Sequence, residues 1–129
     1  MELHGINRLT GLILKSIYNP SIADIEHHLS IIFNGQGAIS ITGDNKDIVE
    51  KLTIFCENKR CYLELIDHRD EYLLRTYFDE NLSLEDSHII SIDHAAECHF
   101  NTITTDFSLI MKICDEYLST NDVSHKVMR

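Results

Sequence analysis

The spacing of hydrophobic residues changes its period twice along the chain, and this change restricts the fold more than any other feature. Between residues 19 and 35 the period is helical, and one face carries Ile22, Ile25, Leu29 and Ile32. From Gly37 the period becomes two, which is typical of strands. A helical period returns after residue 104. This order predicts an α+β fold, with two helices packed on one face of a mostly antiparallel sheet.

The two helices have recognisable ends. The first is expected to begin at Asn19, with Pro20 in its first turn, or at Ser21 in a capping box with Asp24. The last is expected to begin at Thr105, and its apolar face comprises Phe107, Ile110, Met111, Cys114, Tyr117 and Leu118. The expected strands are 8–18, 38–42, 51–56, 61–67, 71–78 and 88–92, with an acidic loop at 80–87 and an extended segment at 97–103.

The length and the apolar content indicate a single domain spanning 1–129. No stretch of about 18 apolar residues is present, and the N-terminal segment does not resemble a signal peptide, so we expect a cytoplasmic protein. In that compartment the four cysteines are expected to be free thiols. Cys56 and Cys61 flank a polar turn and are expected to face each other across a hairpin.

The negative charge is concentrated in about a quarter of the chain. The net charge is −10, and the segment 64–97 holds ten acidic and two basic residues. Such a surface repels nucleic acid and attracts a basic protein. The alternative is a solvated acidic face that only keeps the protein in solution. The residues expected to contact a partner are Glu64, Asp67, Asp70, Glu71, Tyr72, Asp79, Glu80, Glu85, Asp86, Asp93 and Glu97.

The stretch "DHAAECHF" (93–100) contains potential metal ligands, namely His94, Cys98 and His99. A zinc site needs several such ligands converging on one point, and adjacent residues of an extended segment point to opposite faces. A small metal-binding protein or enzyme built on these three residues is therefore the alternative interpretation. Because no nucleophile, base and orienting group share a recognisable pattern, we expect no enzyme and no cofactor.

Two terminal stretches, "NPSIADIEHHLSIIFNGQGAISI" and "TTDFSLIMKICDEYLSTNDVS", resemble a known family. They are similar to the small immunity proteins of bacterial polymorphic-toxin and contact-dependent growth inhibition systems. The matching positions are Pro20, Ser21, Asp24, Ile25, Glu26, Gly37, Thr104, Asp106, Phe107, Tyr117, Asp122, Val123 and Ser124. These are caps, turns and core positions, whereas the middle of the chain (44–100) matches poorly.

The resemblance implies a cytoplasmic antitoxin that binds the toxic C-terminal domain of a cell-surface effector. Many such toxins are nucleases, including nucleases of transfer RNA, and nuclease domains tend to be basic. The acidic segment would then cover the active site or the substrate-binding surface of the toxin. We expect a monomer in a one-to-one complex, without direct contact to nucleic acid or membrane.

Overall fold

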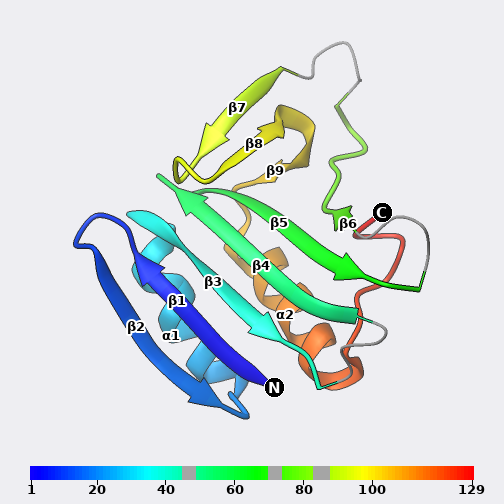
Figure 1. Ribbon diagram of the computed structural model, residues 1–129. Coiled ribbons are helices and arrows are strands. Elements are labelled where there is room, and N and C mark those ends of the chain that lie inside the picture. Colours follow the sequence, from blue (N-terminus) through cyan, green and yellow to red (C-terminus); the bar gives the residue numbers. More distant parts are fainter. Residues whose placement is uncertain (45–48, 70–73, 83–87) are drawn as a thin grey trace.

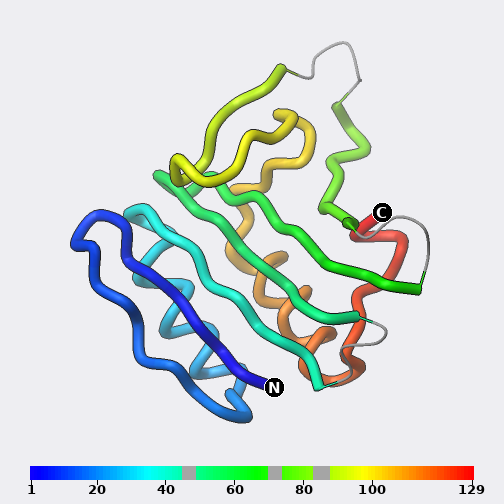
Figure 2. The backbone as a smooth tube through the Cα atoms, in the orientation of Figure 1, coloured from blue at the N-terminus to red at the C-terminus, as the bar shows by residue number. Residues whose placement is uncertain are grey.

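One antiparallel sheet with both helices on one face forms the body of the molecule (Figures 1 and 2). The structure, a computed structural model, describes residues 1–44, 49–69, 74–82 and 88–129. The helices are α1 (Ile22–Phe33) and α2 (Phe107–Thr120). The strands, in their order across the sheet, are β2 (Leu12–Tyr18), β1 (Glu2–Asn7), β3 (Gln36–Thr42), β4 (Val49–Glu57), β5 (Arg60–Asp67) and β6 (Leu74–Thr76). The expected α+β class is confirmed.

A second, smaller sheet was not expected. It consists of β7 (Ile89–Ile92) and β8 (Ala96–His99), and it packs over β4 and β5. Alternate residues of β5 face opposite sides, so Leu63 lies in the main core while Tyr62 lies under the small sheet. A short 3-10 turn (Phe100–Thr102) and β9 (Ile103–Thr104), which pairs with β5, then return the chain to the main sheet.

Both helices begin at side-chain caps. The Ser21 hydroxyl accepts from the Asp24 N–H at 3.2 Å, and the Asp24 carboxylate accepts from the Ser21 N–H at 2.8 Å, so the expected capping box is confirmed. The cap of α2 is Asp106, which accepts from the Leu109 N–H at 3.1 Å, so the prediction of Thr105 is wrong by one residue. Each cap satisfies an N–H group that the first turn leaves unpaired.

The expected strand at 8–18 is only partly a strand. Residues 12–18 form β2, which is the second half of a hairpin whose first strand, β1, was not predicted. Strand β1 precedes it, and residues 8–11 form the turn into β2. The close packing of β1, β3 and α1 requires Gly37, because a Cβ there would lie 2.2 Å from the Ile6 carbonyl oxygen and 2.7 Å from Ile32. Gly37 is one of the positions that match the immunity-protein family, and close packing explains why a glycine is needed there.

The predicted hairpin at the centre of the sheet is confirmed. Strands β4 and β5 pair from Val49–Asp67 to Glu57–Arg60, and the two turn residues between them have positive φ. Cys56 and Cys61 lie directly opposite each other, with Cα atoms 4.3 Å apart, and form a disulfide. The expectation of free thiols is wrong for this pair. Among the described cysteines, Cys98 and Cys114 are free and buried.

The main core lies between the sheet and the two helices. Its most buried members include Ile25 and Leu29 of α1, Tyr117 of α2, and Leu63 of β5. Each such side chain contributes roughly 1.5–3 kcal/mol by leaving water. In the described part of the chain no helix is long and apolar enough to cross a bilayer.

Candidate functional site

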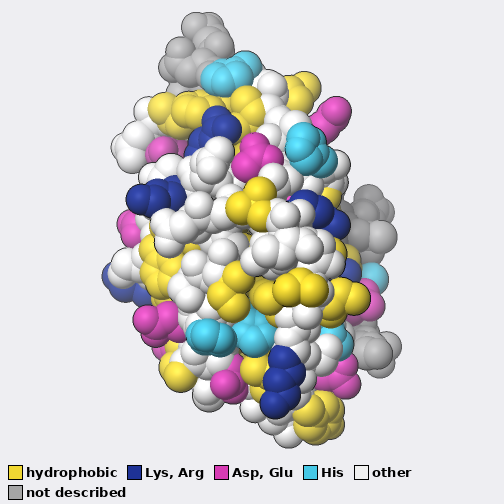
Figure 3. All heavy atoms as spheres, turned by 90° about the vertical axis from the view of Figure 1, so that its left-hand side faces the viewer, with side chains coloured by type: hydrophobic (Ala, Val, Ile, Leu, Met, Phe, Trp, Pro, Cys, Tyr) yellow, Lys and Arg dark blue, Asp and Glu magenta, His cyan; other side chains and the backbone are white. Residues whose placement is uncertain are grey.

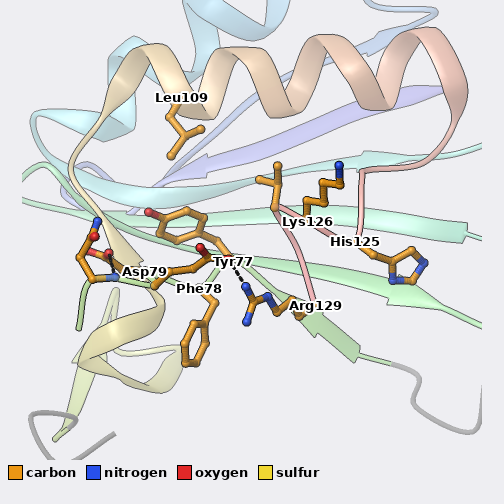
Figure 4. A pocket seen from close by; sticks show the side chains of 10 residues that line it. Tyr77, Phe78, Asp79, Leu109, His125, Lys126 and Arg129 are labelled. Carbon is orange, nitrogen blue, oxygen red and sulfur yellow. Dashed lines mark hydrogen bonds and ion pairs between the residues drawn. The ribbon is translucent and has the colours of Figure 1, made fainter. Parts of the chain in front are cut away.

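Two adjoining hollows lie on either side of Tyr77, and we call them together the Tyr77 groove. Their volumes are about 710 and 530 Å³, and both are lined by Tyr77, Asp79 and Leu109. Figure 4 shows Leu109 reaching from α2 toward the Tyr77 ring, with Asp79 on one side of the ring and Lys126 on the other. The groove therefore lies between the segment that follows β6, the start of α2 and the C-terminal residues.

The C-terminal side of the groove is held by the buried guanidinium of Arg75. It donates to the Met128 carbonyl oxygen at 2.9 and 3.1 Å and to the Val123 carbonyl oxygen at 2.6 Å. The backbone of Thr76 exchanges two hydrogen bonds with Arg129, at 3.0 and 3.2 Å. The C-terminal residues thus pair with the last residue of β6 and, through a bridge between Met128 and Tyr77, with the residue that follows it, and they form a fixed wall of the groove.

Carboxylates hold the Arg75 side chain in turn. Its guanidinium donates to Asp67 and to Asp122, each at 3.0 Å, and Arg69 bonds both of these acids as well. Hydrogen bonds from Arg69, with a smaller contribution from Arg75, lower the pKa of Asp67 well below its usual range, although burial opposes this. The pKa of Asp122 is also lowered, since the hydrogen bonds from Arg69, Val123 and Arg75 outweigh its desolvation.

The groove walls combine aromatic rings with charged groups. The Tyr77 ring is half-buried, and burial followed by the nearby Asp79 and Asp106 raises its pKa. The Arg129 guanidinium lies 5.6 Å from the centre of the Phe78 ring and also pairs with Glu80. Asp79 is a half-buried carboxylate that lines both hollows, so it lies at the junction between them.

The structure separates the predicted partner-binding residues into three groups. Asp79 and Glu80 line the groove, Glu97 is exposed on β8, and Glu64 is half-buried on β5. Asp67 and Asp93 are each only 1% exposed, so the expectation that they belong to a solvent-facing surface is wrong. The remaining predictions lie outside the described residues, and these are Asp70, Glu71, Tyr72, Glu85 and Asp86.

Asp93 joins the two sheets. Its carboxylate accepts from Arg8 Nε at 3.2 Å and from the Arg8 terminal nitrogen at 3.1 Å, and it has a positive φ in the turn between β7 and β8. Arg8 lies in the turn between β1 and β2, so this pair fixes the tip of the small sheet to the main sheet. The stretch "DHAAECHF" therefore begins with a structural ion pair.

The three potential metal ligands of that stretch do not converge. Cys98 is buried against the small hydrophobic cluster, whereas its neighbour His99 and the turn residue His94 are exposed. Burial raises the pKa of the Cys98 thiol to about 11, which disfavours the thiolate that binds metals. No group of three or more metal-binding side chains occurs among the residues that the structure describes.

One hydrogen-bonded chain was not visible in the sequence. On the open face of the sheet, His4 lies 3.0 Å from the Ser16 hydroxyl through Nδ1 and 2.9 Å from the Glu2 carboxylate through Nε2. The order resembles a Ser–His–acid triad. All three residues are exposed, and neither His4 nor Ser16 lines any of the three hollows in the described structure, so we interpret the chain as a surface network. Its formation depends on the unpredicted pairing of β1 with β2.

Comparisons with known proteins place the chain in a family without assigning an activity. The crystal structure of a hypothetical protein from Neisseria gonorrhoeae has the same fold, with a TM-score of 0.70 over 95% of this chain and 89% of that one. The sequence identity is 18%, so the likeness concerns the fold alone. The comparison with curated proteins found no match. A family model described as a family of unknown function (DUF6911) matches residues 4–127, and the chain therefore belongs to this family.

Proposed function

We propose that this protein is a cytoplasmic, non-catalytic immunity protein that binds and neutralises a basic toxin domain. The toxin would be the C-terminal domain of a contact-dependent growth inhibition effector, such as a nuclease acting on transfer RNA. The observation that carries the proposal is the Tyr77 groove. Its wall within the acid-rich segment 64–97 carries the rings of Tyr77 and Phe78 and the carboxylates of Asp79 and Glu80, and its C-terminal wall carries Lys126 and Arg129.

The chemistry of the groove suits a protein partner. Tyrosine and phenylalanine side chains provide large apolar contacts at the centre of an interface, and a polar rim excludes water around them. Tyr77 and Phe78 lie in the groove with Asp79 and Glu80 directly beside them. A segment of the partner could place an apolar side chain against the rings and a basic one at Asp79. The same contact would cover a basic surface on which a nuclease binds its substrate.

The first test is co-expression with the toxin domain encoded beside this protein. The proposal expects protection of the cells and a complex of the two proteins. If the cells die and no complex forms, the proposed function is wrong.

A charge-reversal pair tests where the contact lies. We expect Glu80→Lys with Glu97→Lys to slow association with the toxin domain about tenfold at low salt, because steering by charge acts on the association rate. Both side chains are exposed, so the change should have little effect on folding.

The matched control is Glu26→Lys with Asp115→Lys, two exposed acids on the helices. It changes the net charge by the same amount and should leave the association rate close to that of the wild type. Equal slowing by both double variants would show that net charge alone matters and would remove the acidic segment from the interface. Association rates are measured by surface plasmon resonance at several salt concentrations.

A further inference from the structure

A second surface lies at β2, which is the edge of the sheet opposite to β6 and the Tyr77 groove, and it has no role in the proposed function. Five large hydrophobic residues between positions 9 and 22 are exposed, four of them by at least 66%, and we call the five the apolar edge. They are Leu9 (69% exposed), Leu12 (66%), Ile13 (80%), Tyr18 (72%) and Ile22 (37%). Seen from this side, hydrophobic side chains form a band across the middle of the molecule (Figure 3). Exposed apolar patches of this kind mark interaction surfaces.

The position of β2 in the sheet explains why these residues are exposed. It is the outermost strand, with β1 on one side and no strand on the other among the described residues. The opposite edge of the sheet is the three-residue strand β6. Just beyond β6, Tyr77 pairs with Met128, so the C-terminal residues cover part of that edge. The apolar edge is therefore the longer free side of the sheet, and association through it would stop at a closed dimer instead of a filament.

The backbone of β2 is not suited to extend the sheet into another molecule. The register between β1 and β2 is irregular at Lys15 and Ser16, which together lie opposite His4. A ring nitrogen of the buried His28 also lies 2.8 Å from the Lys15 carbonyl oxygen. Bulges and lysines are features that prevent pairing between edge strands. A contact here would thus be made by side chains.

The charge distribution identifies the occupant. Between Leu9 and Ala23 the sequence contains no acidic residue, and Lys15 is its only charged group, although the chain carries a net charge of −10. Two copies of such a chain repel each other least when they meet at this edge, with their acidic segments far apart. A different acidic protein would also meet less repulsion at the apolar edge than elsewhere on the molecule. A second copy of this chain is the favoured occupant, because it is always present at the same concentration as the first.

We propose that the apolar edge is the interface of a two-fold symmetric dimer of this protein. Apolar residues lie at both ends of β2, with Lys15 and Ser16 between them. Ile13 and Tyr18 both lie on the open face of the sheet, and antiparallel approach about a two-fold axis would place Ile13 of one copy against Tyr18 of the other, with the same contact repeated across the axis. The long Lys15 side chains extend into solvent from the axis. The sequence favoured a monomer, so this proposal departs from that expectation.

The exposed area is sufficient for a modest interface. Taking about 150 Å² for each fully exposed large side chain, the five residues expose on the order of 500 Å² per copy. A standard interface buries about 800 Å² per partner, and the neighbouring polar atoms supply the remainder. We therefore expect a reversible dimer whose population depends on concentration.

Sedimentation equilibrium on the purified wild-type protein tests the proposal at concentrations up to about 100 μM. The chain mass is 14.9 kDa, and the expected result is a mass that rises toward twice this value with concentration. Added salt should increase the dimer population, because it screens the repulsion between two acidic copies. A mass of one chain at every concentration and salt level would overturn the proposal.

Two aspartate substitutions locate the contact. Ile13→Asp should raise the dimer dissociation constant at least tenfold, since it puts a charge in the apolar contact with Tyr18 of the other copy, and this contact occurs twice in a two-fold dimer. The control is Ile89→Asp on β7, where the side chain is 65% exposed, and it should leave the dissociation constant unchanged. Circular dichroism checks that both variants fold, and Tyr18→Asp replaces Ile13→Asp if that variant does not. If Ile13→Asp and Ile89→Asp raised the dissociation constant equally, the assignment of the interface to the apolar edge would be wrong.

Discussion

Asp67 was expected on a partner-binding surface, where its mutation would affect binding. Because the residue is buried, its mutation is now expected to affect the stability of the fold. Its carboxylate accepts hydrogen bonds from the Arg69 N–H and Nε, both at 3.0 Å, and from Arg75 at 3.0 Å, and it also pairs with the end of the Arg69 guanidinium. The residue is 1% exposed and Arg75 is 4% exposed. Asp67→Asn keeps the size of the side chain and removes its charge, so among the described residues the buried Arg75 keeps only Asp122 as an anionic partner.

We expect Asp67→Asn to lower the free energy of unfolding by about 3 kcal/mol, because removing one member of a buried pair leaves the other charge poorly compensated. Urea unfolding followed by circular dichroism measures the change, as a shift of the midpoint by about 1–2 M. The control is Glu97→Gln on β8, an exposed acid of the same segment, which should stay within about 0.5 kcal/mol of the wild type.

The difference between wild type and Asp67→Asn should also depend on pH. The pKa of Asp67 is lower in the folded protein than in the unfolded chain, where an aspartate titrates near 4. As the pH falls below about 4, the unfolded chain takes up the proton first, so the stabilisation by Asp67 is present above this pH and declines below it. A loss of under about 1 kcal/mol at pH 7, with no narrowing of the difference toward pH 2, would refute the assignment of Asp67 to a buried network.

Two further predictions concern the junction of the sheets and the disulfide. Asp93→Asn keeps a residue that tolerates positive φ but weakens the pair with Arg8, so amide exchange in β7 and β8 should accelerate about tenfold or more while β3 is unaffected. If the cytoplasmic location is correct, Cys56 and Cys61 should be reduced in cells, as alkylation of fresh lysates would show. With a sequence separation of 5, reduction should cost no more than about 2 kcal/mol, so urea midpoints should show that the reduced protein stays folded.

Local interactions explain why parts of the fold could be predicted. The capping box of α1 joins Ser21 and Asp24, and the hairpin of β4 and β5 closes over two residues. The face of α2 depends only on a repeat that the helix itself imposes, and Ile110, Cys114 and Tyr117 of that face are buried. Where the apolar period was less regular, as in residues 1–18, the sequence did not separate β1 from the turn that follows it.

The site depended on contacts between distant segments. The sequence located Asp79 and Glu80 within an acidic segment, but the groove exists because the C-terminal residues pair with the chain after β6. On the strand expected at 71–78 the Tyr77 ring could have faced core or solvent with equal ease, since alternation gives no direction when neither face is continuously apolar. Only the packing of α2 and the C-terminal segment around it made a hollow there.

The sequence by itself determined the class of the fold, the start of the first helix, the central hairpin and the uneven distribution of charge. Each of these follows from residues close together in the chain or from a simple count. The tertiary structure decided which charges reach solvent, because Asp93 is paired with Arg8 across 85 positions and Asp122 with Arg69 across 53. A carboxylate becomes part of a binding surface or of the interior according to its partners, and those partners are brought to it only by folding.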